Sequence, residues 1–81
     1  MSKDKRRREA LKKFIFTDMS ENPRISELIA HIDRLPSEYI EELYRELEVI
    51  EPLKVMGMQA MTSETTRKLK NMIDSSLRYH E

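Results

Sequence analysis

An 81-residue chain with 37% charged and 38% hydrophobic residues can bury only one small core. It has no Cys, which excludes a disulfide scaffold and thiolate metal sites and favours a reducing, cytoplasmic environment. No apolar run approaches the roughly 20 residues of a membrane span, and no signal peptide is recognisable, so we expect a single soluble domain over residues 1–81.

The net charge of zero is a cancellation between three segments. Residues 1–20 hold seven bases and three acids, residues 21–51 hold three bases and nine acids, and residues 52–81 hold five bases and three acids. A basic first segment and an acidic middle segment predict electrostatic contact between them or with a partner.

A basic N-terminal helix is predicted over residues 3–19, because Ala10, Leu11, Phe14 and Ile15 fall three and four apart among good helix formers. A second helix is predicted from Pro23, since Asn22 can cap it and Pro fits the first helical position. Its apolar stripe consists of Ile25, Leu28, Ile29, Ile32 and Leu35.

The third predicted helix, residues 36–51, starts at Pro36 and stops before Pro52. Its apolar seam is Ile40, Leu43, Leu47 and Ile50. Because only a residue or two separates it from the second helix, we expect residues 23–51 to form a helical hairpin or a sharp corner.

A Met-rich connector is expected at residues 52–62, where Gly57 weakens any helix. A C-terminal helix is then predicted over residues 63–80, capped by Thr62 or Ser63. Strand-like alternation is absent from the sequence. The expected fold is all-α, a small bundle of about four helices with a central helical hairpin.

The apolar seam of residues 36–51 must be covered by the chain's own helices or by a second copy or partner. Methionines near Gly57 are either gap-fillers of the core or an adaptable binding surface. The predicted interface therefore comprises Ile40, Leu43, Leu47, Ile50, Met56 and Met58.

The residues Leu35, Pro36, Ser37 and Glu38, followed by this leucine seam, resemble the start of oligomerisation hairpins attached to small bacterial and phage regulators. The resemblance implies self-association, with a dimer as the expected state.

Glutamates on the back of the third predicted helix form a solvated surface, an acidic docking surface or, least favoured, a metal site. The docking interpretation selects Glu41, Glu42 and Glu48, which project away from the seam.

Basic residues at the N-terminus and in the last helix are candidates for contacts with nucleic-acid phosphates, although ion pairs between helices, plain solvation or a membrane surface explain the N-terminal ones as well. The candidates are Lys5, Arg6, Arg7, Arg8, Lys12, Arg67, Lys68 and Lys70. A helix-turn-helix is not expected, because its recognition helix would bring glutamates to phosphates.

Enzymatic motifs are missing from the sequence: it has no Gly-rich phosphate loop, no HExxH and no nucleophile elbow. His31 is interpreted as a hydrogen-bonded histidine beside the core, and His80 as a cation at a helix C-terminus. No catalytic residue, metal or cofactor is predicted. We expect a small non-enzymatic regulatory or adaptor protein that self-associates and binds another protein, with nucleic-acid binding as the alternative.

Overall fold

This computed structural model describes residues 2–79 of the chain. Four α-helices and the short connections between them form this part. They are α1 (Lys3–Asp18), α2 (Ile25–Arg34), α3 (Ser37–Val55) and α4 (Gln59–Tyr79). No strand occurs in this part, so the predicted all-α bundle of four helices is confirmed. None of the described helices combines the length and the apolar character needed to cross a membrane.

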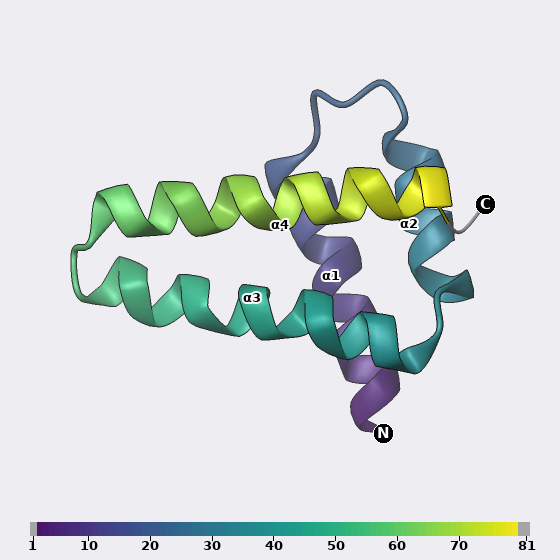
Figure 1. Ribbon diagram of the computed structural model, residues 1–81, viewed down its shortest axis with the longest axis horizontal. Coiled ribbons are helices and arrows are strands. Elements are labelled where there is room, and N and C mark those ends of the chain that lie inside the picture. Colours follow the sequence, from purple (N-terminus) through teal and green to yellow (C-terminus); the bar gives the residue numbers. More distant parts are fainter. Residues whose placement is uncertain (1, 80–81) are drawn as a thin grey trace.

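The helices α3 and α4 form a long antiparallel hairpin, α1 crosses it, and α2 lies near its open end (Figure 1). Helices α2 and α3 meet at a sharp corner, one of the two geometries left open by the sequence for residues 23–51. Leu35 and Pro36 both have extended backbone there. The stripe of α2 consequently packs on α1 and α4 rather than along α3.

The connector between α3 and α4 is shorter than expected, because only residues 56–58 of the predicted segment 52–62 lie outside the helices. Gly57 has a φ of 71°, and its N–H donates to the Lys54 carbonyl at 3.0 Å. The Met58 N–H donates to the Leu53 carbonyl at 3.0 Å, which completes a Schellman motif. Gly57 thus ends a helix that continues for one turn past the Pro52 ring.

The start of α4 also differs from the prediction, since it lies at Gln59 rather than at residue 63. The Thr62 N–H donates to the Met58 carbonyl at 2.9 Å, so Thr62 belongs to the first turn and is not its cap. Residue 80, the predicted last residue of this helix, lies outside the described residues.

A side-chain cap acts at the start of α1. The Ser2 hydroxyl accepts the Lys5 N–H at 3.2 Å at the start of α1. The Asn22 side chain accepts the Arg24 N–H at 2.8 Å. Helix α2 begins at the next residue, Ile25. Asn22 is therefore not the helix cap that was predicted. Its side chain forms a turn with the Arg24 N–H two residues on, the N-cap of α2 is Arg24, and the helix begins at Ile25 rather than Pro23.

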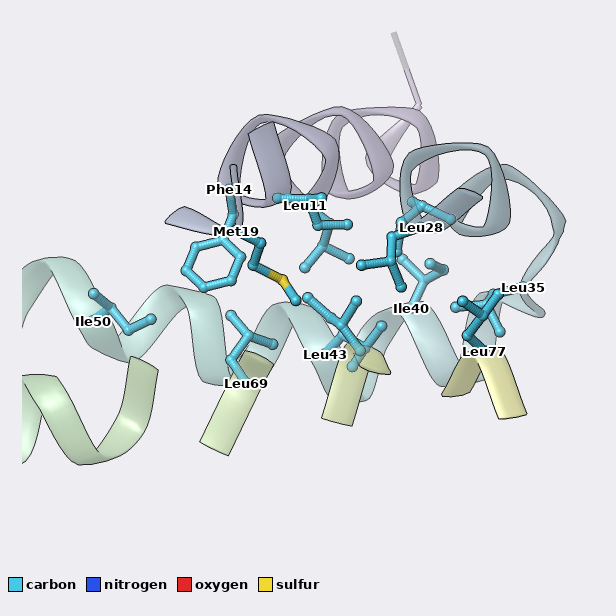
Figure 2. Packing of buried hydrophobic residues seen from close by; sticks show 13 residues of the cluster. Leu11, Phe14, Met19, Leu28, Leu35, Ile40, Leu43, Ile50, Leu69 and Leu77 are labelled. Atoms are coloured by element: carbon cyan, nitrogen blue, oxygen red, sulfur yellow. The ribbon is translucent and has the colours of Figure 1, made fainter. Parts of the chain in front are cut away.

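The hydrophobic core lies between the α3–α4 hairpin and the two N-terminal helices (Figure 2). Leu11 and Phe14 of α1 point toward Leu43 of α3 and Leu69 of α4. Burial of each such side chain stabilises the fold by about 1.5–3 kcal/mol. The core residues are Leu11, Phe14, Ile15, Met19, Leu28, Ile32, Leu35, Ile40, Leu43, Ile50, Leu69, Ile73 and Leu77.

Candidate interaction surface

A groove of about 450 Å³ lies between α1 and the second half of α3, and we call it the α1/α3 groove. It exists because α1 crosses the hairpin part-way along, so that the far ends of α3 and α4 extend beyond it (Figure 1). Its lining residues are Ala10, Lys13, Phe14, Thr17, Asp18, Tyr44, Leu47, Glu48, Ile50, Glu51, Lys54 and Thr66.

The floor of the α1/α3 groove is apolar. Phe14 and Ile50 belong mainly to the core, with 6% and 5% of their surfaces exposed, and each presents an edge to the groove. Leu47 and Tyr44 are only half-buried. An apolar floor that a single chain leaves partly uncovered is typical of a site that receives another apolar surface.

The rim of the groove carries charges of both signs. Lys13 and Lys54 lie there together with the three acids Asp18, Glu48 and Glu51, and all five side chains are exposed. None of them forms an ion pair with another residue of the described chain. The rim charges therefore remain available for a molecule that enters the groove.

Beyond the groove, the closed end of the α3–α4 hairpin is strongly apolar. Val55 and Met56 expose 79% and 67% of their surfaces, and Met58 exposes 37%. Exposed apolar side chains this close together are typical of interaction surfaces. We call residues 55–58 the hairpin tip.

The six predicted interface residues divide between the core, the groove and the hairpin tip. Ile40 and Leu43 are completely buried inside the chain's own bundle, and Ile50 nearly so. Leu47 lies in the α1/α3 groove. Met56 and Met58 lie at the hairpin tip, where both are exposed, so of the six these two and the half-buried Leu47 are accessible to a partner.

The three glutamates of the predicted acidic docking face lie in different surroundings on α3. The Glu41 carboxylate accepts a hydrogen bond from Arg7 at 3.1 Å, while Glu48 lies at the groove rim. Glu42 points about 100° away from Glu41 around the helix. Burial first, and the negative charge of Glu42 second, raise the pKa of Tyr39 above its ordinary value of 10.0.

Four of the eight predicted nucleic-acid contacts are ion-paired within the chain. The Lys12 ammonium lies 2.6 Å from Asp33, and that of Lys68 lies 2.7 Å from Glu46. Arg7 pairs with Glu41 and also lies over the Tyr44 ring, with its guanidinium 5.7 Å from the ring centroid. The fourth is Arg8.

Arg8 joins three helices. Its Nε donates to Asp4 at 2.7 Å, and its Nη1 donates to the Ile32 carbonyl at 2.7 Å, close to the C-terminus of α2, where a cation is favourable. Its Nη2 donates to the Ser37 hydroxyl at 3.4 Å at the start of α3. The hydrogen bonds from Arg8 and then Ser37 hold the pKa of the Asp4 carboxyl below its ordinary value of 3.8.

The remaining candidates are exposed or half-buried and have no ion-pair partner among residues 2–79. They are Lys5, Arg6, Arg67 and Lys70.

His31 is a core residue with 1% of its surface exposed. Its Nε2 lies 3.1 Å from the Ser76 carbonyl oxygen, and because a carbonyl can only accept, Nε2 carries the proton. This bond joins α2 to α4. Within the described residues no group of three or more His, Cys, Asp or Glu side chains is arranged to hold a metal ion.

Comparisons of the chain with protein-family models, with curated proteins and with solved structures gave no match.

Proposed function

We propose that this is a small non-enzymatic regulatory or adaptor protein of the cytoplasm, which self-associates and binds another protein through its helical surfaces. The observation that supports the proposal most is the α1/α3 groove, with its apolar floor, its unpaired rim charges and the apolar hairpin tip beside it. Recognition by apolar grooves between helices requires these features and no catalytic group.

The same surface is poorly suited to chemistry on a small substrate. Active sites place a few titratable groups inside a cleft, where burial or a charged neighbour shifts their pKa values. Asp4 and Tyr39, whose pKa values are shifted, do not line the groove. We therefore assign the groove to binding.

A photo-crosslinking amino acid at Leu47 tests whether the groove receives a protein in cells. We expect crosslinked species with Leu47 replaced, and none with Arg45 replaced, because Arg45 is exposed on α3 outside the groove. The mass of each product distinguishes a second copy from a different protein. Equal crosslinking at both positions, or none at Leu47, would remove the support for this function.

Nucleic-acid binding remains the second candidate, favoured by the exposed and unpaired Lys5 and Arg6 at the start of α1. If it is correct, Lys5→Gln with Arg6→Gln should lower the salt dependence of duplex binding by up to about two units of slope without changing the helical content. Arg7 and Arg8 are unsuitable for this test because they hold internal contacts. Absence of wild-type binding to duplex or single strands at low salt would end this alternative.

A further inference from the structure

We propose that the occupant of the α1/α3 groove is the hairpin end of a second copy of this chain, related by a two-fold axis. Each copy would lay its α3–α4 hairpin end over the same end of the other, so that each hairpin tip reaches α1 of its partner. The inference rests on the self-association in the proposed function and adds the surface and the geometry.

The shape of the chain favours this occupant. The hairpin end projects beyond α1 (Figure 1). The α1/α3 groove lies in the corner between α1 and this hairpin end. A second hairpin end laid antiparallel over the first fills that corner, and the two-fold axis repeats the contact at the other end. The four helical segments would then enclose Leu47 and Ile50 from both copies, as in a four-helix bundle.

The charges of the rim favour a copy of the chain over a strongly charged partner. Two lysines and three acids lie side by side, unpaired, on a chain whose formal net charge is zero. Across a two-fold axis, Lys13 and Lys54 of one copy can meet acids of the other copy, and the reverse contact follows by symmetry. A polyanion or a uniformly basic protein would meet like charges on the same rim.

A dimer would need to bury only a modest part of the exposed surface of the chain. A standard interface buries roughly 800 Å² on each partner, and the chain exposes 5613 Å². The groove alone is small, but it adjoins the hairpin tip, because Lys54 on its rim also lines a second hollow with Gly57 and Met58. The arrangement would cover the exposed side chains of Val55, Met56 and Met58 against Ala10 and Thr17 of the partner.

Complementary rim variants test this geometry. The acidic-rim variant carries Lys13→Glu and Lys54→Glu, and the basic-rim variant carries Glu48→Lys and Glu51→Lys. All four residues are exposed, so circular dichroism should show an unchanged fold. A control variant carries Glu42→Lys and Arg45→Glu, two exposed changes on α3 outside the groove. Association is measured by sedimentation equilibrium.

We expect each rim variant alone to dimerise at least about tenfold more weakly than the wild type, because every reversed contact occurs twice in a two-fold dimer. An equimolar mixture of the two should form a heterodimer about as tightly as the wild type forms a homodimer, and the control should match the wild type. Rescue in the mixture cannot come from pairing within one chain.

Three results would overturn the inference, and they separate it from the proposed function. If the wild type and both rim variants dimerise equally, the chain self-associates through another surface. If the rim variants are weakened but the mixture is not rescued, the groove does not receive a second rim. If the wild type stays monomeric, self-association fails as well, and only a crosslink from Leu47 to a different protein would preserve the adaptor function.

Discussion

At the residue scale, neighbouring positions of the same α3 seam have different environments. Leu43 has no exposed surface, whereas Leu47, one turn later, is half-buried in the α1/α3 groove. Their equal spacing in the sequence cannot reveal this difference, because it depends on where α1 crosses α3. Substitutions at the two leucines should therefore distinguish an effect on the stability of the fold from an effect on the proposed association.

Leu43→Ala should lower the free energy of unfolding by about 2–5 kcal/mol, since it removes a fully buried side chain from the core. Leu47→Ala should cost less stability but weaken dimerisation. Urea denaturation measures the first effect, and sedimentation of the two folded variants measures the second. An equal loss of stability with no change in association would show that Leu47 belongs wholly to the core.

Arg8 is the residue whose role was least predictable from the sequence. It is one of a run of three arginines, and only the structure brings Asp4, the Ile32 carbonyl and Ser37 around it. Arg8→Gln should lower the free energy of unfolding by about 1–3 kcal/mol, because it breaks a part-buried, charge-assisted hydrogen bond to the Ile32 carbonyl. Arg6→Gln is the matched control and should be nearly neutral, since Arg6 is exposed and unpaired.

The Asp4–Arg8 pair also predicts a pH dependence. Because the folded state lowers the pKa of Asp4, the ionised carboxylate stabilises the fold at pH values above 3.8, and this stabilisation is lost as the pH falls through the lowered value. Asp4→Asn should therefore show a smaller drop in stability between about pH 5 and pH 2 than the wild type. Identical acid-denaturation profiles would contradict the assigned pairing.

At the element scale, the helical periods were predictable and the connection between the last two helices was not. Residues 3–18 and the stripe from Ile25 to Leu35 follow the pattern expected of amphipathic helices. The connector around Gly57 combined a helix-weakening residue with strong helix formers, and the Schellman hydrogen bonds that resolve it involve backbone groups only. The α2–α3 corner depended on tertiary packing, since local signals allowed a hairpin equally well.

Gly57 tests this interpretation of the connector. Gly57→Ala should lower the free energy of unfolding by about 1–2 kcal/mol, because a residue with a Cβ is strained at positive φ. An added Cβ would have no heavy atom within 4 Å, so the effect would arise from the backbone alone. Gly57→Asn should cost less, because Asn tolerates this conformation better. A larger loss for Asn than for Ala would contradict the motif.

At the scale of the whole molecule, the core and the proposed binding surface are two consequences of one arrangement. Crossing of α1 over part of the hairpin covers Ile40 and Leu43 and leaves Leu47 and the hairpin tip accessible. The sequence indicated that another surface must cover the seam. It could not show which residues of the seam are covered within the chain and which remain accessible to a partner. The acidic and basic segments likewise meet partly within the chain, through Arg7 with Glu41 and Lys12 with Asp33.

The molar mass of the wild-type chain in solution, measured by light scattering over a wide concentration range, tests self-association most directly. The chain has a mass of 9.7 kDa. Between about 1 µM and 1 mM, which spans dissociation constants from tight to weak, we predict that the mean mass rises toward twice this value and falls again on dilution. A mass that stays at 9.7 kDa over the whole range would contradict the claim that this helical protein self-associates.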